Sequence, residues 1–175
     1  MKVKIHSKHV DAKLKAAMHA MCGFALARLG VSNRITKNLN ITIHMGHHDN
    51  EGEARVAKGA NRYRPRDFKI NLDHHRMEKD DYNRSLEDTE WGHRVLKTLA
   101  HELVHVKQYI VGELSWREAG LLWKGVNWNP DNLLEYYDLP YEIEAHGREY
   151  GLMVGFLVVW TGLEKKFEKE LNKLV

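Results

Sequence analysis

The sequence predicts an α+β fold in a single domain that spans residues 1–175. Three observations support this: strand-like alternation in the first half, two long helical patterns in the second half, and a length that suits one well-packed domain. Because strands precede long helices instead of alternating with them, α+β is favoured over α/β. With 43% hydrophobic and 29% charged residues and a net charge of +3, the composition is typical of a globular chain and not of a disordered one.

The first half predicts a small mixed sheet and one helix. Residues 1–6 read as a short strand, and residues 10–29 carry apolar side chains at helical spacing. The segments 40–46 and 67–73 alternate apolar and polar residues, as half-buried strands do. The polar, glycine-containing stretch 49–65 between them predicts a further strand with loops.

The second half predicts two long helices. Ser85, followed three residues later by Asp88, indicates a capping box from which a helix should run to about residue 111. Its apolar residues fall on one stripe: Val95, Leu99, Leu103 and Val106. Residues 112–138 contain three of the five tryptophans and predict an irregular or hairpin segment. Pro140 then opens the second long helix.

The first of these helices contains the motif HELVH, formed by His101, Glu102 and His105. Residues four apart lie one turn above each other on a helix, so the two imidazoles can meet at one point. Zinc binds neutral imidazole nitrogens, and the glutamate after the first histidine can serve as the general base for an activated water. The spacing therefore predicts His101 and His105 as Zn²⁺ ligands and Glu102 as a catalytic base.

A zinc site of this kind needs a third protein ligand, and segment 138–156 offers three glutamates and one histidine. Its glycines recur on one helical stripe, which would let another helix approach closely: Gly147, Gly151 and Gly155. At about 100° per residue, Glu144 falls inside that stripe, whereas Glu142 and His146 fall outside it. We therefore expect Glu144 to be the third ligand, with Glu142 as the alternative. Without a metal, Glu144 would be a surface carboxylate paired with Arg148.

The motif HELVH, with a glutamate on a later helix, resembles the zincin metallopeptidases of the gluzincin type. HELVHVKQY together with DLPYEIEAHGREYGL is also similar to small metallopeptidase-like proteins of phages and bacteria, over residues 95–155. The resemblance implies a zincin-like domain with an active-site helix and a long C-terminal helix, and hydrolysis of peptide bonds. Gluzincins often place an aspartate four residues after the third ligand, to orient a histidine. Counted from Glu144, that position here is Arg148.

Other segments leave alternatives open. Strand 67–73 is either an edge strand that pairs with a peptide substrate or an internal strand. Four tyrosines near the third-ligand segment could stabilise an oxyanion, although a core or rim aromatic is the favoured interpretation of each: Tyr136, Tyr137, Tyr141 and Tyr150. The histidine-rich segments 44–50 and 73–76 have no fixed spacing that predicts a second chelate.

The remaining features indicate the setting of the protein. A lone cysteine, Cys22, makes no internal disulfide, and residues 1–15 lack the apolar core of a signal peptide, so we expect a cytoplasmic protein. The longest apolar run, 150–160, is about half of a membrane span. The expected partner is a peptide or protein substrate, with nucleic acid permitted but not indicated by the mild charge. The alternative is a catalytically inactive binding or phage structural module with a structural zinc.

Overall fold

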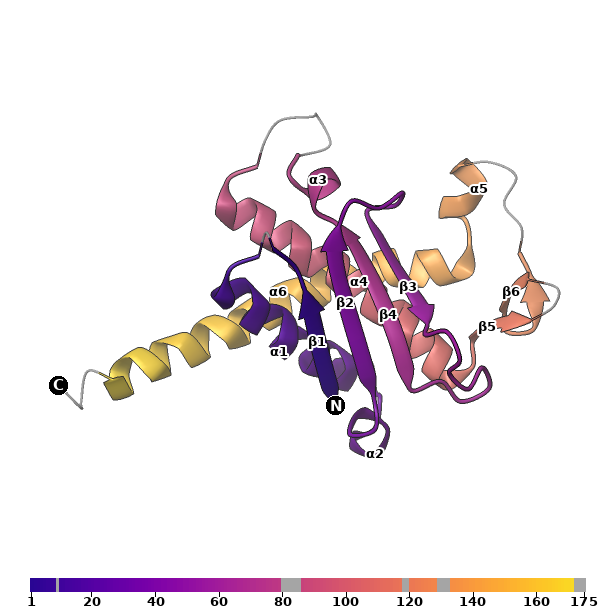
Figure 1. Ribbon diagram of the computed structural model, residues 1–175, viewed down its shortest axis with the longest axis horizontal. Coiled ribbons are helices and arrows are strands. Elements are labelled where there is room, and N and C mark those ends of the chain that lie inside the picture. Colours follow the sequence, from indigo (N-terminus) through magenta and orange to yellow (C-terminus); the bar gives the residue numbers. More distant parts are fainter. Residues whose placement is uncertain (9, 80–85, 118–119, 129–132, 172–175) are drawn as a thin grey trace.

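The computed structural model describes residues 1–8, 10–79, 86–117, 120–128 and 133–171. Its larger sheet has the order β1-β2-β4-β3 (Figure 1). The strands are β1 (Lys2–His6), β2 (Asn40–Gly46), β3 (Gly52–Val56) and β4 (Asp67–Asp73). β1, β2 and β4 are parallel, and β3 is antiparallel to β4. The predicted mixed sheet is therefore confirmed.

Strand 67–73 is internal in this sheet, because β4 pairs with β2 on one side and β3 on the other. The antiparallel strand β3, which falls in the stretch 49–65 where a strand with loops is predicted, forms one edge of the sheet, and β1 forms the other. Within β2 and β4 alternate residues are buried, among them Ile41, Ile43, Phe68 and Ile70. This alternation turns one face of the sheet toward the helices and the other toward solvent.

Six helices complete the described chain: α1 (Ala12–Arg28), α2 (Asn33–Thr36), α3 (His74–Met77), α4 (Asp88–Val111), α5 (Leu133–Tyr137) and α6 (Pro140–Leu171). Between α4 and α5 lies a small antiparallel sheet, made of β5 (Leu114–Arg117), β6 (Gly120–Trp123) and β7 (Val126–Asn127). The α+β class and the long C-terminal helix are thus confirmed. None of the described helices is both long and apolar enough to cross a membrane.

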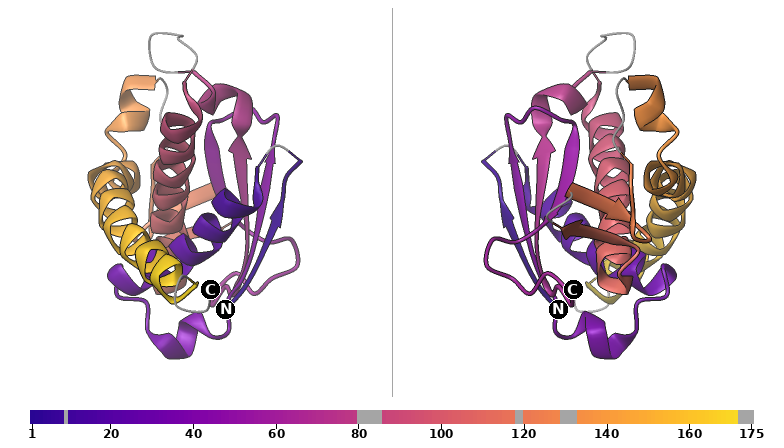
Figure 2. Two further views of the ribbon diagram at one scale, coloured as in Figure 1. Left: turned by 90° about the vertical axis from the view of Figure 1, so that its left-hand side faces the viewer. Right: turned by 90° about the vertical axis from the view of Figure 1, so that its right-hand side faces the viewer.

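Helix α4 lies between the sheet and α6, and α1 packs beside it (Figure 2). Its predicted apolar stripe is fully buried, with Val95, Leu99, Leu103 and Val106 at 0% exposure. Ser85 lies outside the described residues. The helix begins at Asp88 with a capping box between Glu87 and Glu90, and ends at Gly112, whose φ of 79° suits glycine.

Candidate metal centre

Helix α4 carries His101, Glu102 and His105 into the interior, where all three side chains are buried. The two Nε2 atoms of the histidines lie 3.0 Å apart. His101 Nδ1 is 2.8 Å from Glu149 Oε2, and His105 Nδ1 is 2.8 Å from Gln108 Oε1. Because both partners are oxygen acceptors, each Nδ1 donates a proton and the Nε2 atoms converge. The convergence predicted from the four-residue spacing is confirmed.

Glu142 is the carboxylate at this histidine pair. Its Oε2 lies 3.2 Å from His101 Nε2, and its Oε1 lies 3.5 Å from His105 Nε2. Glu142 is 4% exposed. Three donor atoms from two helices, two imidazole nitrogens and a carboxylate, therefore gather at one point.

The expected position of Glu144 is corrected by these contacts. Its carboxylate accepts hydrogen bonds from Lys107 Nζ at 3.2 Å and Gln108 Nε2 at 3.1 Å, and it pairs with Arg148 Nε at 3.1 Å. Glu144 thus points toward the cations Lys107 and Arg148 and not toward the imidazole Nε2 atoms. The surface pair with Arg148, considered above as the alternative, is present.

The prediction of Glu144 is wrong because the glycine stripe is not the face of α6 that packs on α4. A Cβ added at Gly147 or Gly151 would meet nothing within 4 Å, and Ile143 is 56% exposed. Over residues 140–162, where burial is described, the buried residues of α6 lie on another face, and they are Tyr141, Glu142, Ala145, Glu149, Leu152, Met153 and Phe156. Glu142 belongs to that face, and Glu144, two residues along, turns about 200° away from it.

His146 is a second nitrogen near the centre. His101, Glu142 and His146 have donor atoms within 4.8 Å of one another, so this triad also has metal-ligand spacing. However, the His146 side chain is 42% exposed, and its Nδ1 faces Glu149 Oε2 at 3.3 Å. His105 is buried and is oriented by Gln108, so its position is fixed without a metal. His101 and His105 are therefore the two imidazoles best placed to hold a metal ion.

Carboxylates control the charge of the imidazoles. Burial alone would lower the pKa of His101, but hydrogen bonds to Glu142 and Glu149 raise it to about 10. The pKa of His105 is raised in the same way by Glu142, against the effect of burial. The pKa of Glu142 is strongly lowered by the two histidines, although burial opposes this. A metal ion must therefore displace protons from this centre.

Glu102 lies next to His101 on α4, and its side chain faces strand β3. It is 3% exposed, and its Oε2 has no hydrogen-bond partner among the described residues. Burial raises its pKa to about 7, although His105 and His101 act in the opposite direction. A Cβ at Gly52 would clash with Glu102 Oε1 and lie 2.8 Å from Thr98 Cγ2. Glycine at this point of β3 therefore makes room for the glutamate.

A shell of polar residues holds the histidines, and sequence analysis did not identify it. Gln108 donates through Nε2 to Tyr141 O at 3.0 Å and to Glu144, which fixes its Oε1 toward His105. Glu149 also pairs with Lys97 Nζ at 3.1 Å. Both were detectable in principle, because Gln108 is three residues after His105, and Glu149 is seven residues, or two turns, after Glu142.

Among the four tyrosines considered above, Tyr136 has the strongest link to the centre. Burial and the adjacent Glu142 carboxylate raise the pKa of Tyr136 well above its usual value. The ring of Tyr141 packs 6.1 Å from that of His105, and Tyr137 packs 5.6 Å from His146. Tyr150 is 66% exposed. Tyr136 is therefore the hydroxyl best placed to act at the centre.

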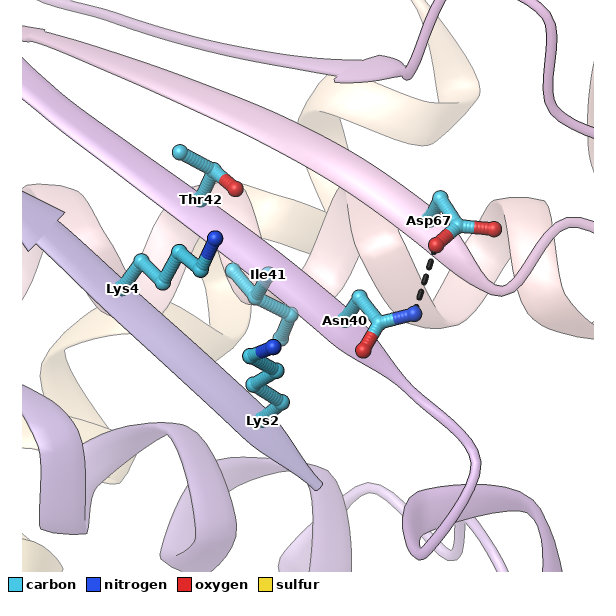
Figure 3. Close-up of a pocket in the computed structure, with 6 residues that line it drawn as sticks. All are labelled: Lys2, Lys4, Asn40, Ile41, Thr42 and Asp67. Carbon is cyan, nitrogen blue, oxygen red and sulfur yellow. Dashed lines mark hydrogen bonds between the residues drawn. The ribbon is translucent and has the colours of Figure 1, made fainter.

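A separate polar hollow lies on the outer face of the sheet (Figure 3). It is lined by Lys2, Lys4, Asn40, Ile41, Thr42 and Asp67. Asn40 Nδ2 donates to Asp67 Oδ1 at 2.6 Å, which satisfies the one carboxylate in the lining. The sheet separates this hollow from the histidines, so it is not part of the candidate centre.

The donor set fits a catalytic zinc ion. Two histidines and one glutamate are a known ligand combination for such sites, in which a fourth position stays open. Each histidine is oriented through its Nδ1, as zinc-ligating histidines usually are. Comparison with family models, with curated proteins and with solved structures gives no match, so no relative supports or opposes these assignments.

Proposed function

We propose that the protein is a zinc-dependent, gluzincin-like metallopeptidase of the cytoplasm that hydrolyses peptide bonds. The observation that carries the proposal is Glu102, a buried carboxylate with an unpartnered oxygen beside two converging imidazoles. A purely structural zinc site has no use for such a group. A buried ionisable side chain without a partner is costly, and groups of this kind cluster at functional sites.

His101, His105 and Glu142 would hold the zinc ion. When bound, zinc supplies activation of water and polarisation of a substrate carbonyl. Glu102, with its pKa near neutrality, accepts the proton of the attacking water and delivers it to the leaving amine as the C–N bond breaks. Tyr136 is placed to donate a hydrogen bond to the developing oxyanion.

The edge strand β3 supports a peptide as the substrate. Because β3 pairs with β4 on one side and ends the sheet order, its other edge can pair with an extended chain. Gly52 of β3 adjoins Glu102, so a peptide aligned on this edge would run past the catalytic base.

The test is cleavage of a mixed peptide library by the zinc-loaded protein, with Glu102→Gln as the matched control. We expect cleavage by the wild type, and zinc content without cleavage for the variant. Full activity of the variant would refute the role of Glu102. Zinc binding without any cleavage by the wild type would favour the inactive binding module with a structural zinc.

A further inference from the structure

A second group of histidines lies at the carboxyl ends of the parallel strands β2 and β4, where Figure 1 shows the short helix α3. His47 follows β2, and His74 and His75 open the short helix α3 directly after β4. Helix α3 packs on α4, and after α3 the carbonyl of Lys79 accepts a hydrogen bond from Arg94 Nη1 of α4. Arg94 precedes His101 by two turns, or roughly 10 Å along the helix. This group is therefore separate from the candidate metal centre.

Asp73 organises the group. It is fully buried, at 0% exposure, and accepts hydrogen bonds from the backbone N–H of His48 at 2.7 Å and of Arg76 at 3.0 Å. It also lies 3.3 Å from His47 Nδ1. The Asp73 carboxylate thus links the loop after β2 to helix α3 by hydrogen bonds. Because its oxygens are used in these contacts, Asp73 positions the group and is not counted among the ligands.

The donor atoms of His74, His75 and Glu78 lie within 4.8 Å of one another. His74 Nδ1 is 3.3 Å from the Gly46 carbonyl, which orients the ring and assigns its proton to Nδ1. His74 Nε2 is then 4.0 Å from Glu78 Oε1, and His75 Nδ1 is 3.4 Å from Glu78 Oε2.

These separations suit a metal ion. Tetrahedral zinc with bonds near 2.1 Å holds its donor atoms about 3.4 Å apart. The Glu78 side chain is 53% exposed, so rotation of its carboxylate can close the longer distance. The ring of His47 packs edge-on to that of His75 at 5.9 Å, which brings another imidazole to the same place.

We propose that His74, His75 and Glu78 form a second metal site, for Zn²⁺ or a similar borderline divalent cation. Two imidazole nitrogens and one carboxylate select such ions over Mg²⁺ and Ca²⁺, which prefer oxygen ligands. The site is more open to solvent than the centre on α4, since the His75 side chain is 60% exposed. The second ion therefore binds more weakly than the first.

The experiment is titration of the metal-free full chain with Zn²⁺, followed by calorimetry and by metal analysis after gel filtration. The test variant is His75→Ala with Glu78→Gln, because both side chains are largely exposed and their removal leaves the core intact. The control is His19→Ala, an exposed histidine on α1. The wild type and the control should bind two equivalents, and the test variant one.

A parallel variant, His101→Ala with His105→Ala, separates this proposal from the proposed function. It should keep one equivalent, the one that the His75→Ala, Glu78→Gln variant loses. If the His75→Ala, Glu78→Gln variant binds two equivalents of Zn²⁺ with unchanged affinities, the second site is refuted. It is also refuted by a wild type that binds one equivalent and loses it with His101 and His105. If neither His101 nor His105 affects zinc binding while His75 and Glu78 do, the second site stands and the proposed function falls.

Discussion

Replacing Glu102 by glutamine should stabilise the metal-free protein at alkaline pH but not at acid pH. Burial raises the pKa of Glu102 from 4.5 to about 7. Between these values the folded protein keeps a proton that the unfolded chain releases, so this group makes stability fall as pH rises through that window. Glutamine cannot ionise and does not impose this loss.

The magnitude follows from the pKa difference. Each unit corresponds to about 1.4 kcal/mol, so ionising Glu102 in place costs about 3 kcal/mol once the pH exceeds 7. The raised pKa already includes the opposing attraction of His105 and His101. The free energy of unfolding of the variant, relative to that of the wild type, should therefore increase by about 3 kcal/mol from pH 4.5 to pH 8.

The assay is urea unfolding of both proteins after chelation of metal, at several pH values from 4.5 to 8. The exposed Asp138→Asn replacement removes a carboxylate without burial and serves as the control. A stability difference between Glu102→Gln and the wild type that stays constant across this range would refute the reasoning, because it would mean that Glu102 is not ionised at a cost in the folded protein.

Three further predictions concern the metal and the base. Glu142→Gln should weaken zinc affinity by more than about 100-fold, and Glu144→Gln by about tenfold at most, because Glu144 reaches the histidine pair only through Gln108. Competition with a chelator measures both affinities. A larger loss for Glu144→Gln than for Glu142→Gln would restore Glu144 as the ligand. Gly52→Ala should push Glu102 out of place and lower kcat/KM roughly 100-fold while zinc content is unchanged, and normal turnover would contradict the close approach. Because the pKa of His101 is raised to about 10, zinc competes with a proton for this imidazole below that pH. The affinity of the protein for zinc should therefore rise from pH 6 to pH 9, and calorimetry in two buffers should show proton release on binding. A zinc affinity independent of pH would count against this centre.

Sequence patterns predicted the parts of the fold that depend on local periodicity. The alternation in 40–46 and 67–73 and the apolar stripe of α4 follow from the repeat of strand and helix, and each is present. The convergence of His101 and His105 is also local, because both ligands belong to one helical turn. The first turn of α4 was less predictable, since Glu87 takes the capping role that Ser85 was expected to have.

The parts that failed depend on how elements meet. Glycines on α6 indicated a packing face, yet the face that meets α4 is the one with Ala145 and Glu149, and this choice decides between Glu142 and Glu144. Likewise, no local pattern shows that β3 is the edge strand or that Gly52 adjoins Glu102. The histidine-rich segments 44–50 and 73–76 showed no chelating spacing in the sequence, because His74, His75 and Glu78 become neighbours only through the turn of α3.

The carboxylate that completes the centre on α4 comes from a helix 41 residues further along the chain than His101. During synthesis the HELVH turn is therefore made well before its third donor exists, and a nascent or truncated chain that stops short of α6 has only two donors for a metal. Under the proposed function, hydrolytic capacity would thus arise only after the first turn of α6 has been made. Under the same proposal, fragments that lack α6 would have no complete centre with which to cleave other proteins.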